Sequence, residues 1–330
     1  MISQAVDIVL QLCLYDDREQ LLRSIDESEM GNIAMAAAKN GVSGWLKERL
    51  QSVYAHVENS EEMQKTLRQD IFNTYALNQK NISICQFIKE RLSENGIEMA
   101  LLKGAALMTS YYRDITLRPI GDIDIWVDHK DVYRAYDILV AAGMTATYTC
   151  RTHVLQESIQ THLPQLTYRG QIIEIHYNLY SHDSKRNPSC SLNQHIISGN
   201  GFNILDESMM LYSLTTHLMK NRETIGLRVG WIVDIRMLFD KLGERQEEIK
   251  REAKSYNPSM AEDMDEVWDS LKTPTADMLE GENLELKHGI ASRLRSMKCL
   301  GVAALRSLCE KPSAKRIADI AYDIRHRHYE

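Results

Sequence analysis

The sequence predicts an α+β protein in which a small sheet-containing core lies between helical N- and C-terminal lobes. Three observations support this prediction. Residues 1–95 contain few Gly and Pro residues, and their apolar residues recur at helical spacing. Short apolar runs separated by turns follow between Gly96 and Leu179, which indicates strands, and helical spacing then resumes. The expected organisation is an N-terminal lobe over 1–95, a core over 96–205 and a C-terminal lobe over 206–330.

The clearest helix of the N-terminal lobe is predicted from about Glu61 to Glu94. Ser60 is a suitable N-cap, and Glu61 and Glu62 suit the positive end of the helix dipole. Asn95 and Gly96 form a typical helix stop. One apolar stripe follows this helix, made of Leu67, Ile71, Tyr75, Ile82, Cys85, Ile88 and Leu92.

Short elements are predicted in the core, because apolar runs of strand length alternate there with helical patterns. The strands are expected over Ile97–Leu102, Ile120–Val127 and Gln171–Leu179, and the helices over Ala105–Tyr112 and Val132–Ala142. One more strand is expected, without a firm position, between Thr145 and Thr167. In the C-terminal lobe, one helix is expected from about Asp206 past Leu218 and another over Gly226–Leu242, and the acidic and basic stretches beyond also have helical patterns.

The most informative polar residues are Asp122 and Asp124, at i and i+2 in the predicted strand Ile120–Val127. Because strand side chains alternate, both carboxylates and Trp126 point to one face and the intervening isoleucines to the other. Two neighbouring carboxylates repel each other and are costly to bury unless a cation lies between them. Oxygen ligands of this kind suit hard divalent cations such as Mg²⁺. The pair therefore indicates a metal site, although an Asp-x-Asp pattern on an edge strand can also simply face water.

Two further features suit the transfer of a nucleotidyl group. Lys103 and Gly104 interrupt a strand just before a helix, where free backbone N–H groups and a nearby cation can bind phosphate. Glu174 and His176 repeat the i, i+2 polar pattern on the third strand, which makes Glu174 a candidate third carboxylate. Phosphoryl-type transfer uses such carboxylates to hold metal ions that bridge the attacking and leaving oxygens.

Each of these residues also has a structural interpretation. Gly104 can be only a turn glycine, and Lys103 and Glu174 can be solvated surface groups. Arg118, shortly before the Asp pair, can bind a phosphate or form a surface ion pair. His176 is better interpreted as a hydrogen-bonded structural histidine than as a metal ligand. His217 and Asp234 are similarly better explained as polar groups in helix packing than as catalytic groups.

The motifs Leu101-Leu102-Lys103-Gly104, Asp122-Ile123-Asp124 preceded by Arg118, and Glu174-Ile175-His176 resemble the nucleotidyltransferase superfamily of the DNA polymerase beta type. Within it, the chain is most similar to a group of uncharacterised nucleotidyltransferases, over roughly residues 95–240. The helical stretch with His217, Trp231 and Asp234 also looks like that group's follow-on segment.

The resemblance implies a mixed sheet flanked by helices, an NTP co-substrate and a divalent metal, Mg²⁺ or Mn²⁺. By motif position it implies that Asp122, Asp124 and Glu174 are the catalytic metal ligands and that Gly104 is the turn glycine. Lys103 and Arg118 can add positive charge near this turn, so the expected nucleotide-binding residues are Lys103, Gly104 and Arg118.

Two features depart from the superfamily pattern. The turn is Gly104-Ala105 instead of Gly-Gly or Gly-Ser, so it offers no hydroxyl to a phosphate, a loss that Lys103 could offset. The gap from Gly104 to Asp122 is also long for the superfamily, although it suits the subgroup. A second hypothesis therefore stays open, namely an inactive nucleotide-binding or interaction module on the same core. The intact acids argue against it, because an inactive module has no need of a repulsive Asp pair.

The composition of the chain limits the classes of molecule that the protein is expected to bind. The net charge of −7 argues against a general nucleic-acid binder, so the expected acceptor of the nucleotidyl group is a small hydroxylated molecule or a protein. Six scattered Cys residues without a Cys-x-x-Cys pair indicate free thiols in a reducing compartment. The sequence shows neither a signal-peptide pattern nor an apolar stretch of membrane-spanning length. A cytoplasmic enzyme without a membrane partner is the expectation.

Overall fold

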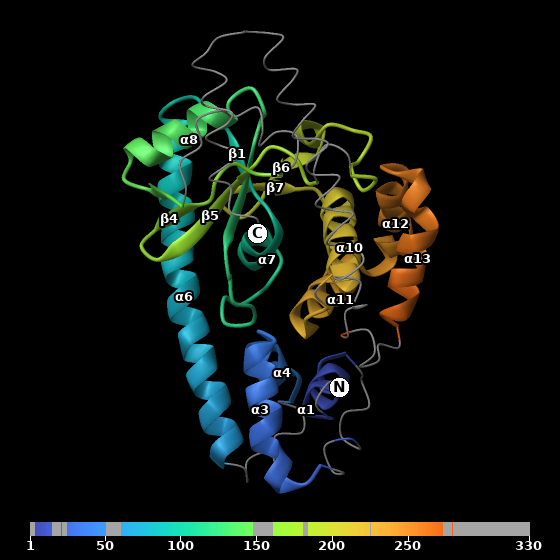
Figure 1. Ribbon diagram of the computed structural model, residues 1–330. Coiled ribbons are helices and arrows are strands. Elements are labelled where there is room, and N and C mark those ends of the chain that lie inside the picture. The colour runs from blue at the N-terminus through green and yellow to red at the C-terminus, as the bar shows by residue number, and fades with distance from the viewer. Residues whose placement is uncertain are drawn as a thin grey trace.

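The computed structural model describes residues 4–14, 21, 25–50, 61–147, 161–180, 184–224, 226–272 and 279 (Figure 1). The prediction of a helical basic segment after residue 280 lies outside these residues, as does part of the region in which an unplaced strand was expected. Within the described residues, no helix combines the length and apolar character that crossing a membrane requires. Among the described residues, Cys13, Cys85 and Cys190 form no disulfide bond.

A mixed sheet of seven strands forms the centre of the described structure, in the order β3-β4-β5-β2-β1-β7-β6. Strand β2 is antiparallel to β1 and parallel to β5, and β1 is parallel to β7. The strands are β1 (Met99–Leu101), β2 (Ile123–Val127), β3 (Thr145–Ala146), β4 (Leu166–Tyr168), β5 (Gln171–His176), β6 (Ile196–Ser198) and β7 (Asn203–Leu205). The predicted α+β fold with a mixed sheet is confirmed.

The three predicted strands correspond to β1, β2 and β5, each shorter than expected. Strands β3 and β4 lie at the two ends of the region where one strand was left unplaced. Strands β6 and β7 were not predicted at all. Each has only three residues, and the turn between them is rich in Gly, so neither shows the alternation that marks a longer strand.

Helices surround this sheet on several sides. The N-terminal lobe contains α1 (Gln4–Leu14), η1 (Glu27–Glu29), α3 (Met30–Lys39), α4 (Ser43–Leu50) and the long helix α6 (Glu61–Ser93). The core adds α7 (Lys103–Ser110), α8 (Val132–Ala141) and η3 (Leu192–His195). The C-terminal lobe contains α10 (Glu207–Thr224), α11 (Val229–Leu242), η4 (Gly243–Arg245), α12 (Gln246–Ser255), η5 (Pro258–Met260) and α13 (Ala261–Ser270).

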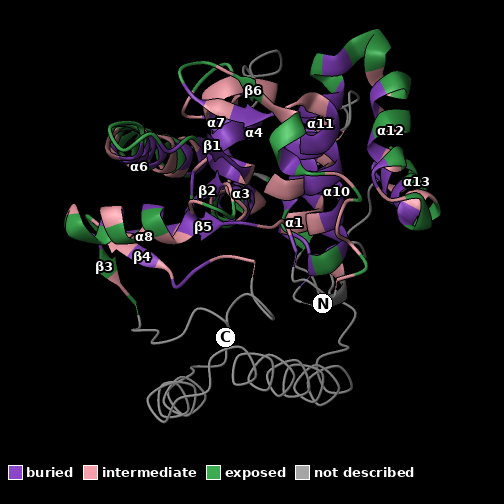
Figure 2. Ribbon diagram, turned by 90° about the horizontal axis from the view of Figure 1, so that it is seen from above, coloured by how far each residue is buried: buried purple, intermediate pink, exposed green. Residues whose placement is uncertain are grey.

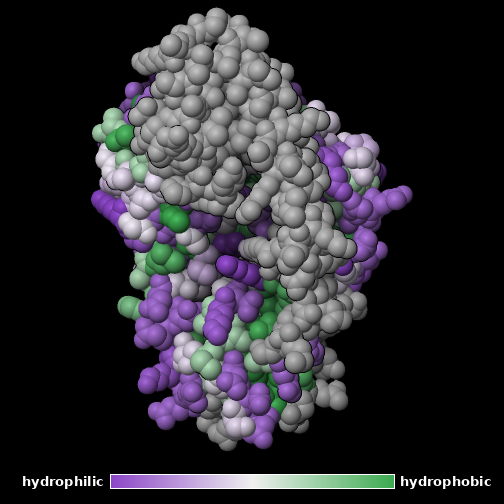
Figure 3. All heavy atoms as spheres, in the orientation of Figure 1, coloured by the Kyte–Doolittle hydropathy of each residue, from purple (hydrophilic) through white to green (hydrophobic). Residues whose placement is uncertain are grey.

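The helices of the two lobes approach the sheet from different sides. Helix α6 packs on α8 at one end and on α3 and α4 at the other, so it connects the sheet to the N-terminal lobe (Figure 1). Helix α10 packs on α7 and β7. Seen from above, buried residues gather around β1, β2, α7 and α10, and exposed residues lie on the outer sides of α12 and α13 (Figure 2). In the described part of the N-terminal lobe, hydrophilic side chains cover most of the visible surface (Figure 3).

Two asparagines on α6 hold the loop that leads into β2. Asn78 is fully buried; its Nδ2 donates to the carbonyls of Ile115 and Arg118 at 2.5 and 2.7 Å, and its Oδ1 accepts from the N–H of Ile120 at 2.9 Å. Asn81 donates to the carbonyl of Ile120 at 3.0 Å. These side chains satisfy backbone groups that would otherwise be buried without partners. Helix α6 therefore fixes the backbone just before Asp122.

The prediction that one apolar stripe runs along α6 is wrong near Asn78. Tyr75 was expected to be buried, and it is 45% exposed, whereas Thr74, Asn78 and Asn81 face the interior. The reason is the irregular loop that α6 covers here, because its carbonyl and amide groups need polar partners instead of apolar packing.

Asn78→Ala is expected to lower the free energy of unfolding by roughly 1–3 kcal/mol, because it leaves buried backbone groups of the loop without partners. Chemical denaturation measures this loss. The matched control is Asn73→Ala, on the exposed side of the same helix, which should change stability by less than about 0.5 kcal/mol. Equal stabilities of the two variants would contradict the role assigned to Asn78.

Candidate active site

The sheet brings the second predicted Asp and the predicted Glu together. Because β2 and β5 are parallel neighbours, Asp124 and Glu174 stand opposite each other in register, and so do Trp126 and His176. One ligand atom each from Asp124, Glu174 and His176 lies within 4.8 Å of the others. The isoleucines between them, Ile123, Ile125, Ile173 and Ile175, are fully buried. The alternation inferred from the sequence therefore places the acids on a common face.

Asp124 is the most buried acid of this group, with 1% of its surface exposed. Its Oδ1 accepts hydrogen bonds from Lys103 Nζ at 2.6 Å and from His176 Nε2 at 2.7 Å. Burial alone would raise the pKa of this carboxyl, but the adjacent Lys103 and His176 hold the pKa far below its usual range. Asp124 is therefore ionised, and Lys103 supplies the cation that a buried carboxylate requires.

Asp122 lies just outside the strand on which it was predicted. Strand β2 begins at Ile123, and Asp122 occupies a bend before it, with an exposed side chain. The negative charge of Asp124 is the main cause of a raised pKa at Asp122. The carbonyl of the preceding Gly121 accepts a hydrogen bond from buried Gln171 on β5, which ties this bend to the sheet. Asp122 is thus close enough to Asp124 to share its electrostatic field, but it is more accessible.

His176 joins the two inner acids. Its Nε2 lies 2.7 Å from Asp124 Oδ1 and 3.2 Å from Glu174 Oε2, and these hydrogen bonds raise its pKa against the opposing effects of burial and of Lys103. Its Nδ1 is buried and has no hydrogen-bond partner among the described residues. A histidine that binds a metal through one nitrogen usually donates a hydrogen bond from the other. The orphaned Nδ1 therefore favours the interpretation of His176 as a partner that orients the carboxylates.

The residues present fit a hard divalent cation. The carboxylates of Asp124 and Glu174 lie side by side on two paired strands, and His176 is the third residue of this close group. Asp122 lies outside the group, at the exposed bend before β2, where it is near enough for the charge of Asp124 to raise its pKa. Gln165 Nε2 donates to Glu174 Oε1 at 2.8 Å, so this carboxylate is oriented from the neighbouring segment. Oriented carboxylate oxygens form the donor set that Mg²⁺ and Mn²⁺ prefer.

The first turn of α7 begins beside Asp124. The backbone N–H of Leu102 donates to the carbonyl of Asp124 at 3.0 Å, and Leu102 provides no side-chain cap for α7. Lys103 then adopts a φ of 45°, which is rare for a residue with a side chain. Such strain is concentrated at functional sites, where the surrounding structure holds it in place. The uncapped N–H groups of α7 and the ammonium of Lys103 thus converge near the acids.

Gly104 makes room for the guanidinium of Arg118. A Cβ on Gly104 would lie 3.0 Å from Arg118 Cζ and closer still to Nη1. Arg118 cannot easily withdraw, because it forms a two-pronged ion pair with buried Asp234 of α11, with Nε–Oδ1 at 2.8 Å and Nη2–Oδ2 at 2.9 Å. Tyr112 also donates to Asp234 Oδ1 at 2.8 Å. The ion pair expected as one structural alternative for Arg118 exists, but it is buried, and direct contact of Arg118 with a nucleotide stays a prediction.

Gly104→Ala is expected to displace Arg118 and to weaken its pairing with Asp234, because the added methyl group and the guanidinium cannot occupy the same space. The expected loss of stability is roughly 1–3 kcal/mol, measured by thermal or chemical denaturation. Gly121→Ala is the matched control, because a Cβ at Gly121 would meet nothing within 4 Å. A Gly104→Ala protein as stable as the control would show that Arg118 moves aside freely.

Helix α10 contributes polar residues that sequence reasoning did not place at the site. The positive charge of Lys103 and the negative charge of Glu174 both act on Lys220, whose pKa is lowered chiefly by partial burial. Burial lowers the pKa of His217 to about 3, and its Nε2 lies 2.8 Å from Asn221 Nδ2, consistent with a neutral ring. The spacing of His217 and Lys220 on one helical face could have identified them, but only after α10 was known to face the acids.

One protein family matches most of the chain. The family described as uncharacterised nucleotidyltransferase matches residues 26–261, which extends the predicted resemblance into the N-terminal lobe. No curated protein matches the sequence significantly. Two solved structures of the antibiotic-resistance factor ANT(2'')-Ia, one in solution and one in complex with adenylyl-2''-tobramycin, are each 10% identical to the chain with a TM-score of 0.40. The matched regions cover 58% and 55% of this chain, and 99% of the ANT(2'')-Ia chain in each structure. On the family match, together with the acids brought into register by β2 and β5, the chain belongs to the uncharacterised nucleotidyltransferases and is an enzyme of the nucleotidyltransferase class.

Proposed function

We propose that this protein transfers an NMP group from an NTP to a hydroxyl acceptor in a reaction that depends on Mg²⁺ or Mn²⁺. The observation that carries the proposal is the pairing of Asp124 with Glu174 on neighbouring parallel strands, beside the start of α7. Asp122, Asp124 and Glu174 would hold the metal, which when bound supplies charge stabilisation to the reacting phosphate oxygens. The membership of a nucleotidyltransferase family supports the same reaction class.

Lys103 and the first turn of α7 are the proposed phosphate site. Free N–H groups at a helix N-terminus attract anions, and the Lys103 ammonium adds a full positive charge. Gly104 leaves space for the guanidinium of Arg118, which Asp234 holds beside this turn, and Gly104 and Arg118 are the other two proposed nucleotide-binding residues. Lys220 from α10 adds a cation on the facing helix. The missing hydroxyl at Ala105 is thus offset by charge.

Glu174 is the proposed base. Its carboxylate takes the proton of the acceptor hydroxyl as the new bond from that oxygen to the α-phosphorus forms and the bond to the leaving pyrophosphate breaks. Gln165 and His176 hold this carboxylate from either side. Lys103 and Lys220 balance the negative charge of the departing pyrophosphate.

Glu174→Gln is expected to lower turnover by about 100-fold or more and to leave NTP affinity nearly unchanged, because the glutamine cannot accept the proton while the two aspartates still hold the nucleotide-bound metal. Single-turnover kinetics and equilibrium NTP binding measure the two effects. Glu98→Gln, an exposed acid before β1, is the matched control and should match the wild type. Wild-type turnover in Glu174→Gln would remove this residue from the mechanism.

The direct test of the function uses purified protein with Mg²⁺ or Mn²⁺ and each α-labelled NTP. Pyrophosphate release with transfer of the label to an added acceptor or to the protein itself supports the proposal, and chelation of the metal should stop it. The second candidate is an inactive nucleotide-binding module, which the Gly104-Ala105 turn favours. NTP binding without pyrophosphate release under any of these conditions would favour that module.

A further inference from the structure

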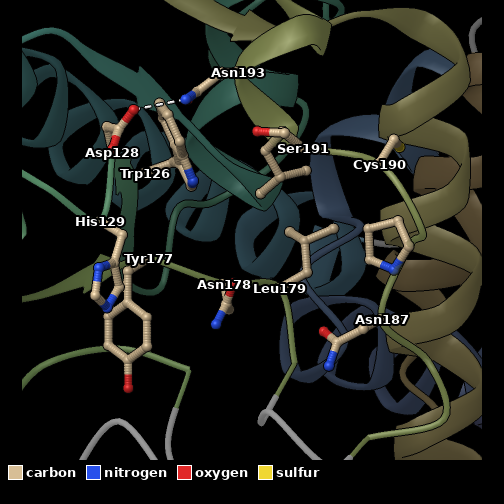
Figure 4. A pocket seen from close by; sticks show the side chains of 12 residues that line it. Trp126, Asp128, His129, Tyr177, Asn178, Leu179, Asn187, Cys190, Ser191 and Asn193 are labelled. Carbon is tan, nitrogen blue, oxygen red and sulfur yellow. Dashed lines mark hydrogen bonds between the residues drawn. The ribbon is translucent and has the colours of Figure 1, made fainter.

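A cavity of about 240 Å³ lies at the ends of β2 and β5, outside the residues assigned to metal or phosphate. Trp126 and Asp128 contribute from β2 and the residue that follows it, and Tyr177 and Asn178 from the segment just after β5 (Figure 4). The segment with Asn193 closes the other side. By strand alternation, Trp126 shares its face with Asp124, two residues or roughly 7 Å along β2. The cavity is therefore adjacent to the acids.

Two polar side chains of this cavity have no hydrogen-bond partner among the residues that the structure describes. Neither the Trp126 indole N–H nor the Asn178 side-chain amide forms a hydrogen bond with any other described residue, although Trp126 is only 7% exposed. Asp128 Oδ2 accepts from Asn193 Nδ2 at 2.6 Å, which orients both side chains. A few oriented polar groups beside aromatic surface are typical of a binding site for a small molecule.

The charge of the lining selects the kind of ligand. None of the twelve lining residues is Lys or Arg, and Asp128 is their only acid. A backbone hydrogen bond from Lys130 lowers the pKa of Asp128, so this carboxylate is ionised at neutral pH. Lys130, which is not a lining residue, lies 3.9 Å from Asp128 Oδ2 and partly balances this charge. The lining itself offers no ammonium or guanidinium group to a phosphate or carboxylate. The side-chain amides and the carboxylate can instead form hydrogen bonds with the hydroxyl groups of a ligand. The aromatic rings can pack against the C–H groups that lie between those hydroxyl groups.

The position of the cavity suits an acceptor whose hydroxyl group attacks the α-phosphorus. Helix α7 starts at the Asp124 end of β2, because β1 and β2 are antiparallel, and the cavity lies past the opposite end of that strand. The attacking and leaving oxygens lie roughly in line on opposite sides of the phosphorus. With pyrophosphate held at Lys103, the hydroxyl approaches from the side of Trp126.

The volume of the cavity is below the usual 300–1,000 Å³ of ligand pockets, which suits a small acceptor or one ring of a larger acceptor.

We propose that the cavity lined by Trp126, Asp128, Tyr177, Asn178 and Asn193 is the acceptor site, and that it binds a small neutral or cationic polyhydroxylated molecule such as a sugar, amino sugar or cyclitol. This inference rests on the proposed nucleotidyl transfer. One hydroxyl of the acceptor loses its proton to Glu174 and becomes bonded to the α-phosphorus, and pyrophosphate leaves. The products are a nucleotidylated polyol and pyrophosphate.

The test uses the full chain and four probes, glucosamine, myo-inositol, glucuronate and glucose 6-phosphate. Ligand-observed NMR measures binding without catalysis, and pyrophosphate release with NTP and metal measures transfer. Asn178→Leu, which keeps nearly the same side-chain shape but removes the amide, should weaken binding of the neutral or cationic probes and raise their KM by about tenfold, with the KM for NTP unchanged. Asn200→Ala, on the exposed turn before β7, is the matched control and should behave as the wild type.

Two outcomes would overturn the acceptor site. One is stronger binding of the anionic probes than of the neutral and cationic ones. The other is label transfer to a protein, including this chain itself, at a rate that Asn178→Leu does not change. Failure of the nucleotidyl transfer itself is distinguishable, because polyol binding that depends on Asn178 would then persist by NMR without pyrophosphate release. If Asn178→Leu does not fold, Asn193→Ala at the exposed rim provides the same comparison with a smaller change.

Discussion

Asp124→Asn is expected to abolish metal-dependent pyrophosphate release, with a loss of more than about 100-fold. Even residues that only hydrogen-bond a metal ligand typically contribute 10–100-fold, and Asp124 is a proposed ligand at the centre of the acid group. The substitution also removes the negative charge that Lys103 contacts at 2.6 Å. We therefore expect a lower melting temperature as well, since Lys103 and His176 lose their charged partner.

The matched control for this prediction is Asp137→Asn, an exposed acid on α8. It should retain full activity, and its melting temperature should equal that of the wild type. Pyrophosphate release and thermal denaturation of both variants provide the comparison. Wild-type activity in Asp124→Asn would remove the metal assignment, and a higher melting temperature would mean that repulsion from Asp122 outweighs the ion pair with Lys103.

Asp234→Ala is expected to lower the free energy of unfolding by about 3–5 kcal/mol, because it leaves the guanidinium of Arg118 unpaired in a largely buried position. It also removes the acceptor of the Tyr112 hydroxyl, which lies in the same buried group. Because Arg118 supports Gly104 at the start of α7, NTP affinity should fall in any variant that still folds. Chemical denaturation and equilibrium NTP binding measure the two effects.

The control for this second prediction lies on the same helix. Asp240 of α11 also pairs with arginines, Arg236 at 3.1 Å and Arg49 at 3.8 Å, but its side chain is 47% exposed. Asp240→Ala should therefore cost less than about 1 kcal/mol. Similar losses for Asp234→Ala and Asp240→Ala would contradict the claim that burial makes the first pair structurally important.

The sequence was sufficient to predict the elements and residues that depend on local pattern. The long helix α6, the strands β2 and β5 and the common face of Asp124 and Glu174 all follow from regular spacing, and the structure has each of them. The metal and phosphate roles of these residues stay predictions until they are measured. The boundaries at residues 95 and 205 also stay predictions, although every described strand lies between them.

Other parts of the site depend on contacts between distant segments, which spacing does not reveal. Asn78 lies on α6 and binds a loop about 40 residues further along the chain, so its burial had no local indication. Arg118 and Asp234 are similarly brought together only when α11 packs on the core. Lys103 was expected at the phosphates, but its hydrogen bond to Asp124 required the antiparallel register of β1 and β2.

The central claim is that the carboxylates beside α7 hold a divalent metal together with an NTP. The most direct measurement is anomalous diffraction from crystals grown with Mn²⁺ and a non-hydrolysable NTP analogue. We expect an anomalous peak bonded to Asp124 and Glu174, with the triphosphate reaching Lys103 and the first turn of α7. Mn²⁺ bound away from these carboxylates, or a nucleotide whose phosphates do not approach Lys103, would contradict it.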